Sequence, residues 1–186
     1  LPMAHIAERS TSHYGALVFG YEVSCCPDPN QLMPYLKEVH PQLMFGVPRV
    51  YEKIHTAVVA KFDEAHGPKR RLIEWALGVG RRESLLRREG KPLPPLLALQ
   101  HRLAAALVFK KVKARLGGRL RLPISGGAPL SLEIAEFFDT LGICIMEGYG
   151  LTECSPIVSA NWPGARKLGS VGKPLPSVRV LIDHDV

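Results

Sequence analysis

The chain has 186 residues, of which 46% are hydrophobic and 22% are charged, and its formal net charge is +7. This composition excludes an intrinsically disordered chain, and the length is enough for one domain with a substantial core. The apolar runs fall far short of the ~18 residues that a membrane-spanning helix needs. Because the sequence begins with Leu1 and stops in a strand-like run at Val186, we expect it to be a piece of a longer protein.

The cysteines do not have the spacing that holds zinc. Cys25 and Cys26 are neighbours, Cys144 and Cys154 lie far from them, and no C-x-x-C pair occurs. We expect free, mostly buried thiols and therefore a reducing, cytoplasmic location.

Positive charge gathers in residues 69–121, which hold 15 of the 24 lysines and arginines but only three acidic residues. Such a segment permits binding to phosphates, to nucleic acid or to an anionic membrane, and a solvated helix face explains it equally well. Only Trp75 and Phe109 are aromatic there, which argues against stacking on single strands, and we expect no nucleic-acid partner. Peripheral contact with the inner face of an anionic membrane remains an expectation.

The first half of the chain alternates helical and strand-like runs. We predict helices over residues 4–19, from about 31, and over 49–66, and strands over 20–27 and 42–48. A basic helical segment follows at about 69–118. Its second helix starts at Pro94–Pro95 and stops at Gly117–Gly118, and it has leucines on one side at Leu96, Leu99, Leu103 and Leu107.

The second half continues this alternation. We predict a strand within 119–127, a helix capped by Ser131 and ended by Gly142, a short buried strand at 143–146 and a last strand at about 177–183. Alternation of this kind predicts an α/β fold in layers, with a largely parallel sheet flanked by helices.

Two glycine-rich segments each follow a predicted strand directly. They are "SGGAPL" (125–130, the first glycine segment) and "EGYGLTE" (147–153, the second glycine segment). Ligands of open parallel sheets bind beyond the carboxyl ends of the strands, so we expect both segments to contribute to one site.

The residue types of these segments suit a nucleotide. Gly126 and Gly127 would let a flat ring approach the backbone, and Tyr149 offers a face for stacking. The Thr152 hydroxyl can bind a phosphate oxygen, and the Glu153 carboxylate can bind Mg²⁺, which prefers oxygen ligands. On spacing alone, two tight turns would also explain both segments.

Three ordered motifs carry a resemblance to a known family. The two glycine segments, followed by "GSVGKPLP" (169–176, the third glycine segment), resemble the adenylate-forming superfamily. "LPMAHIAER" (1–9), "VPRVYEKI" (47–54) and the long helical stretch after the latter are similar to AMP-forming long-chain fatty-acid–CoA ligases. The resemblance covers essentially the whole chain and implies that residues 1–186 are an incomplete, central part of the large N-terminal AMP-binding domain.

For the nucleotide, the resemblance implies that Gly126, Gly127 and Ala128 lie along the adenine and that Tyr149 stacks on its other face. Thr152 would contact the α-phosphate and Glu153 would help to bind Mg²⁺, and both would take part in catalysis.

For the acyl substrate, the resemblance implies that His5 lies near the acyl pocket. Gly148 and Gly150 would let the substrate carbonyl approach the backbone, and Gly172 would be a packing glycine near the same pocket.

The implied reaction joins a long-chain fatty acid to ATP as acyl-AMP and then transfers the acyl group to CoA. The alternatives are a fatty acyl-AMP ligase that passes the acyl group to a carrier protein, and a non-catalytic basic module that binds a membrane surface. The family's phosphate loop should precede residue 1, and its ribose-binding aspartate, hinge and catalytic lysine should follow residue 186. We therefore expect the 186-residue chain alone to be inactive.

Overall fold

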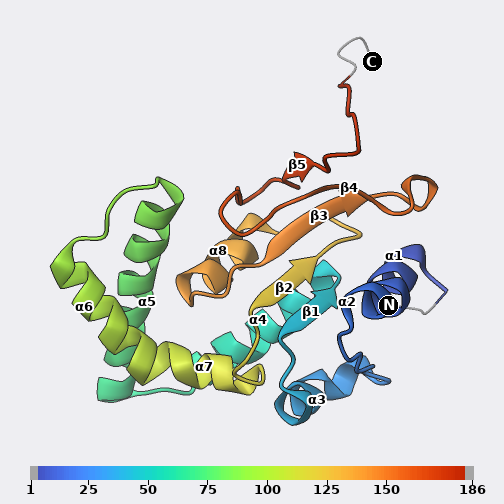
Figure 1. Ribbon diagram of the computed structural model, residues 1–186. Coiled ribbons are helices and arrows are strands. Elements are labelled where there is room, and N and C mark those ends of the chain that lie inside the picture. The colour runs from blue at the N-terminus through green and yellow to red at the C-terminus, as the bar shows by residue number, and fades with distance from the viewer. Residues whose placement is uncertain (1–3, 183–186) are drawn as a thin grey trace.

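A computed structural model describes residues 4–182 of the chain. Its centre is one five-stranded sheet in the order β1–β2–β3–β4–β5 (Figure 1). The strands are β1 (Leu43–Gly46), β2 (Leu122–Ser125), β3 (Met146–Gly150), β4 (Ile157–Ala160) and β5 (Lys173–Pro174). The first three strands run parallel, and β4 and β5 extend the sheet in antiparallel fashion. The predicted α/β fold with helices flanking the sheet is confirmed.

Helices occupy most of the remaining chain. The N-terminal helical run comprises α1 (Ile6–Glu8), a π-helical stretch (Arg9–Tyr14) and α2 (Gly15–Phe19). A short 3-10 turn (Pro29–Gln31) leads into α3 (Leu32–Val39), and α4 (Pro48–Asp63) follows β1. The basic segment forms α5 (Gly67–Arg88), α6 (Pro95–Ala104), a π-helical stretch (Ala105–Phe109) and α7 (Lys110–Arg115). The last α-helix of the described residues, α8 (Leu132–Thr140), connects β2 to β3.

Two predicted strands are wrong. Residues 20–27 form no strand, because the chain folds back on the N-terminal helical run, where the Tyr21 hydroxyl donates to the Thr11 carbonyl. Residues 177–182 form no strand either, since the chain turns at Val178 and leaves the sheet with Leu181 and Ile182 exposed (Figure 1). Asp183, the last residue of that prediction, lies outside the described residues.

Two smaller expectations also differ from the structure. Ser131 stands at the N-cap of α8, but its hydroxyl makes no capping hydrogen bond. The thiols are free, yet Cys25, Cys26 and Cys154 are exposed and Cys144 is half-buried, because the first two lie in the irregular stretch before α3 and Cys154 lies in a surface turn.

The core lies between the sheet and the helices α4 and α8. Tyr51, Ile54 and Val58 of α4 and Phe138 of α8 are almost completely buried, and α8 packs against both α4 and α5. The apolar faces of α4 and α8 are therefore covered, as a layered fold requires.

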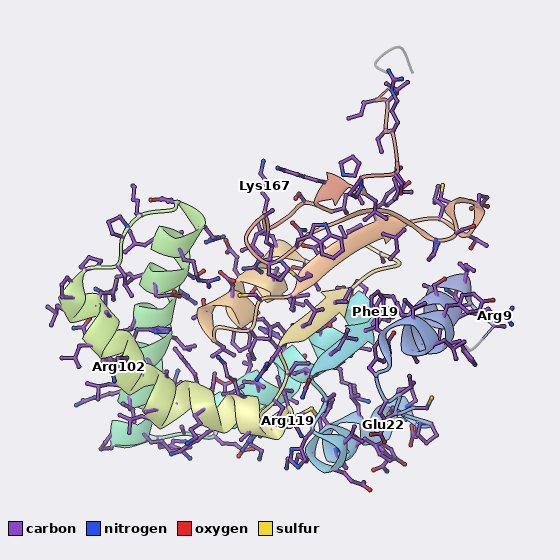
Figure 2. All side chains as sticks on the ribbon, in the orientation of Figure 1. Arg9, Phe19, Glu22, Arg102, Arg119 and Lys167 are labelled. Atoms are coloured by element: carbon purple, nitrogen blue, oxygen red, sulfur yellow. The ribbon has the colours of Figure 1, made fainter. Side chains whose placement is uncertain are left out.

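The basic segment forms a helical arm beside the sheet. Figure 1 shows α5 and α6 on the left, whereas the arrowheads of β2 and β3 point to the right, toward the N-terminal helices. Arg102 lies on α6 within this arm (Figure 2). The positive charge is thus separated in space from the carboxyl ends of the parallel strands.

Candidate functional site at the carboxyl edge of the sheet

The parallel pairing of β2 with β3 brings the first two glycine segments together. Ile124 aligns with Met146 and Ser125 with Glu147, so Gly126 leaves β2 beside Gly148. A Cβ atom placed on Gly126 would lie 3.5 Å from the Gly148 carbonyl oxygen. The two segments therefore lie side by side at one edge of the sheet, as the strand-end rule predicts.

The second glycine segment differs from its predicted form. A strand was expected at 143–146 with the glycines beyond it, but β3 begins at Met146 and includes Gly148, Tyr149 and Gly150. The reason is β4, which pairs antiparallel with this stretch and aligns Gly148 with Ala160. The backbone of Tyr149 therefore belongs to the β3–β4 ladder and does not lie in a free loop.

The polar residues that follow β3 are open to solvent. Tyr149 is 46% exposed, and Thr152 and Glu153 stand exposed in a one-turn 3-10 helix (Thr152–Cys154). The backbone N–H of Leu151 donates to the Pro156 carbonyl at 2.8 Å and closes this turn. An aromatic ring, a hydroxyl and a carboxylate are thus all exposed at the end of β3 and in the turn that follows it.

Packing alone explains two of the predicted site glycines. A Cβ atom at Gly150 would lie 1.8 Å from the Pro156 carbonyl oxygen, and one at Gly172, where φ is +79°, would lie 2.1 Å from Ala160 backbone atoms. At Gly126 and Gly148 the nearest contacts of a Cβ atom would be ordinary, at 3.5 and 3.6 Å. The fold therefore requires glycine at 150 and 172, whereas a Cβ atom at Gly126 or Gly148 would make only ordinary van der Waals contacts.

The remaining residues of the first segment differ in exposure. Gly126 is buried, whereas Gly127 and Ala128 are exposed. The third segment lies close by, since a Cβ atom on Gly169 would come within 3.6 Å of Leu132 at the start of α8. All three segments are therefore neighbours.

His5 lies at the start of the N-terminal helical run. Its side chain is exposed, and its Nδ1 accepts the backbone N–H of Ala7 at 3.2 Å as the N-cap of α1. In Figure 1 this helix lies on the side toward which β2 and β3 point. The geometry gives His5 a capping role, and its place near an acyl pocket stays a prediction.

Sequence reasoning missed Glu147, which is a buried carboxyl group in β3. Burial raises its pKa above the ordinary value for glutamate, whereas the backbone N–H groups of Leu130 and Gly169 and the charge of Arg166 act in the opposite direction. The sequence did offer a signal for a buried carboxyl group: Glu147 directly follows the apolar run "ICIM" (143–146), which was expected to be a buried strand.

The described residues contain no cluster of three or more histidine, cysteine or acidic side chains that could hold a metal ion. Glu153 offers a single exposed carboxylate. Mg²⁺ in phosphate-binding enzymes often uses one or two carboxylates together with substrate phosphates, so this donor fits the predicted ion. Over residues 4–182, no helix is both long and apolar enough to cross a membrane.

Glycine-rich segments at the carboxyl edge of parallel strands are typical of α/β domains that bind nucleotides. Comparison with known proteins makes the class specific: residues 1–185 match the family model of AMP-binding enzymes. The chain belongs to this family, and the resemblance to adenylate-forming enzymes is confirmed.

Similar proteins carry the names of fatty-acid–CoA ligases. The long-chain-fatty-acid–CoA ligase FadD15 of Mycobacterium bovis is 35% identical over 188 residues, covering 100% of this chain and 31% of that protein. Long chain acyl-CoA synthetase 6, peroxisomal, of Arabidopsis thaliana is 35% identical, covering 98% and 25%. The human long-chain-fatty-acid–CoA ligase ACSBG2 is 37% identical, covering 93% and 26%. The chain spans about a third or less of the length of these curated relatives.

Proposed function

We propose that this chain is the central part of the AMP-binding domain of a long-chain fatty-acid–CoA ligase. The whole enzyme would join a fatty acid to ATP as acyl-AMP, release pyrophosphate, and pass the acyl group to CoA. The observation that carries the proposal is the alignment of Ser125 with Glu147, which sets the two glycine segments side by side. Family membership and the names of the similar proteins support the choice of reaction.

The proposed chemistry follows from the residue types. A carboxylate is a poor electrophile, and its attack on the α-phosphate of ATP makes AMP the group that the CoA thiol later displaces. Gly126, Gly127 and Ala128 would line the adenine, Tyr149 would stack on it, and the Thr152 hydroxyl would donate to an α-phosphate oxygen. Glu153 would hold Mg²⁺, which neutralises phosphate charge when it is bound. Catalysis would then rest on positioning and charge neutralisation.

We assign the acyl side of the site to His5 and to glycines of the second and third segments. His5 would border the acyl pocket, and Gly148, which has no side chain, would let the substrate carbonyl approach the backbone. Gly150 and Gly172 would support the same region through the backbone contacts that they permit.

The acceptor and the activity of the fragment form two further parts of the proposal. CoA is favoured over a carrier protein because the similar proteins are named CoA ligases. The isolated 186-residue chain would be inactive, since it covers a third or less of those relatives.

Pyrophosphate release by a full-length protein that contains this chain tests the function. We expect release that depends on a fatty acid of long chain, followed by formation of acyl-CoA when CoA is added. Acyl-AMP that accumulates with CoA but disappears with a carrier protein would instead support the carrier-dependent alternative. No fatty-acid-dependent pyrophosphate, with or without CoA, would contradict the proposal.

We further propose that the arm contacts an anionic membrane surface. Leu96, Leu99, Leu103 and Leu107 recur at helical spacing and are 46–69% exposed, although the opposite side of this helical stretch is buried. No acidic residue occurs between residues 90 and 132, while exposed basic side chains flank the leucines at Arg102, Lys110, Lys111 and Arg115. An apolar stripe flanked by basic residues fits the boundary of an anionic bilayer, where fatty acids also partition. The enzyme would then be a cytoplasmic protein at the inner face of a membrane.

Pelleting of the full-length protein with phosphatidylglycerol vesicles tests this surface. We expect the double substitution Leu99→Ser and Leu103→Ser to weaken binding at least about tenfold, because two leucines would no longer enter the bilayer. The control, Leu17→Ser with Val18→Ser on the exposed end of α2, should bind as the wild type does. Equal binding by the arm variant, or no vesicle binding by the wild type, would contradict the proposal.

A further inference from the structure

A compact loop carries the start of the third glycine segment. Residues 161–172, the β4–β5 loop, contain no helix or strand, and the pairing of Ala160 with Lys173 brings the two ends of this loop together. A Cβ atom on Gly172 would lie only 2.3 Å from the backbone nitrogen of Asn161, so the loop closes on itself. Loops of this length whose ends meet are compact units and frequently take part in function.

Asn161 holds the β4–β5 loop through three hydrogen bonds. Its side-chain oxygen accepts the backbone N–H of Lys167 at 2.9 Å, and its amide nitrogen donates to the Ser170 carbonyl at 2.5 Å. Its own backbone N–H donates to the Glu147 carbonyl at 2.8 Å, at the first residue of the second glycine segment. One residue therefore connects two points of the loop to β3.

Few other contacts fix this loop. Within residues 161–172, all of which the structure describes, only Asn161 is buried, and it is 3% exposed. Leu168 packs against the core but is only partly buried, and Arg166 pairs with Asp139 of α8. A segment that buries little apolar surface can open locally while the core stays folded, so its conformation depends on its polar contacts. Loss of the Asn161 side chain should therefore loosen the loop more than it destabilises the domain.

The β4–β5 loop lies against the chain that carries the first two glycine segments. A Cβ atom on Gly169 would come within 3.6 Å of Leu132, which lies two residues beyond the first segment. The hydrogen bond from Asn161 to the Glu147 carbonyl places another part of the loop at the start of the second segment. A displaced loop would therefore remove support from both segments.

We propose that Asn161 is a positioning residue that holds the third glycine segment against the first two and keeps the nucleotide site in its binding geometry. It would act through the backbone of Lys167 and Ser170 and would not touch the nucleotide. The inference rests on the proposed function, because it assumes that the first two segments bind the nucleotide. It predicts that nucleotide affinity depends on the hydrogen bonds of the Asn161 side chain and not on the space that it fills.

The test compares Asn161→Ala and Asn161→Asp with the wild type in a full-length protein that contains this chain. AMP binding is measured by calorimetry, opening of the loop by hydrogen exchange of peptides within residues 162–172, and Tm by thermal unfolding. Asn161→Asp keeps the shape of the side chain and an acceptor for Lys167, but its carboxylate has no donor for Ser170. We expect both variants to weaken AMP binding about tenfold, the effect of losing one or two hydrogen bonds, and to speed exchange in the loop.

Two further variants serve as controls. Val58→Ala leaves a cavity in the core beneath α4 and should lower Tm at least as much as Asn161→Ala does, while AMP binding and loop exchange stay as in the wild type. Glu133→Gln changes an exposed residue of α8 next to Leu132, and it should match the wild type in all three measurements.

Three results would overturn the proposal. Unchanged AMP binding in Asn161→Ala would show that the site does not need the side chain. Unchanged binding in Asn161→Asp would show that its shape is sufficient without the donor to Ser170. An equal loss of AMP affinity in Val58→Ala would assign the effect to general destabilisation of the domain.

The two proposals can fail separately. A wild-type protein that binds AMP but releases no pyrophosphate with any fatty acid contradicts the proposed reaction, while AMP affinity and loop exchange still decide the role of Asn161. A wild-type protein that binds no AMP contradicts both.

Discussion

Tyr51 lies beneath the strand that leads into the first glycine segment. It is 1% exposed, its hydroxyl donates to the Ile124 carbonyl at 2.8 Å, and its ring meets that of Phe138 edge to face at 6.0 Å. Burial raises the pKa of this hydroxyl far above its ordinary value, so the group stays protonated and remains a donor at physiological pH. One residue of α4 thus fixes both β2 and α8 behind the site.

Tyr51→Phe removes only this hydroxyl and with it the hydrogen bond to the Ile124 carbonyl. We expect the free energy of unfolding of the domain to fall by about 1 kcal/mol, the usual net value of such a hydrogen bond. Urea denaturation measures the change, with Tyr14→Phe on the exposed N-terminal helical run as the control. If both variants unfold at the same urea concentration as the wild type, the hydroxyl does not support β2.

Glu153→Gln tests the carboxylate at the end of β3. Because Glu153 is exposed, we expect no change in Tm, whereas Mg²⁺-dependent pyrophosphate release by the full-length protein should fall about 100-fold. Steady-state kinetics over a Mg²⁺ titration measure the loss. Activity equal to that of Glu133→Gln would exclude a role for Glu153 in catalysis.

At the scale of elements, Asp139 joins three parts of the fold. It is fully buried on α8, where it pairs with Arg166 of the loop before the third segment, with Arg87 of α5 at 3.2 Å and with the Ser84 hydroxyl. Burial raises its pKa, but the Ser84 hydrogen bond and the two arginine charges outweigh that effect and hold the pKa below its ordinary value. The arm and the loop are therefore connected to α8 through one carboxylate.

Asp139→Ala leaves Arg166 and Arg87 without this partner, and we expect a loss of about 3–5 kcal/mol in the free energy of unfolding. The lowered pKa means that the ionised carboxylate contributes its full stability above the unfolded value of about 4 and loses it as pH falls through the folded pKa. Denaturation at several pH values should show the gap between wild type and variant closing in acid. A constant gap would contradict the charged network, and Asp63→Ala on the exposed end of α4 is the control.

Local sequence patterns predicted the helices, whose backbone hydrogen bonds form within one segment. Helical periodicity located α4, α5 and α8, and the strand-end rule predicted that the first two glycine segments would lie at the same edge of the sheet. The run at 20–27 has strand-like residues but no partner strand, and β4 was missed because its antiparallel pairing with a glycine-rich stretch depends on tertiary structure. The burial of Glu147 could not be predicted for the same reason, since it depends on the tertiary structure around β3.

At the scale of the whole molecule, the two proposed surfaces are separate. The glycine segments lie at the carboxyl edge of the parallel strands, whereas the arm, which carries Leu96, Leu99, Leu103 and Leu107, lies on the left of the sheet in Figure 1. α5 and α8, which are in contact, connect the arm to the site. Loss of membrane binding through the arm should therefore leave nucleotide affinity unchanged.

Photolabelling with 8-azido-ATP tests most directly whether the glycine segments bind the adenine. The full-length protein is irradiated with the probe, digested, and its labelled peptides are sequenced, with excess ATP as the competitor. We expect ATP-protected label within residues 125–130 or 147–153. Label that ATP suppresses but that lies only elsewhere in the protein would contradict the proposed nucleotide site.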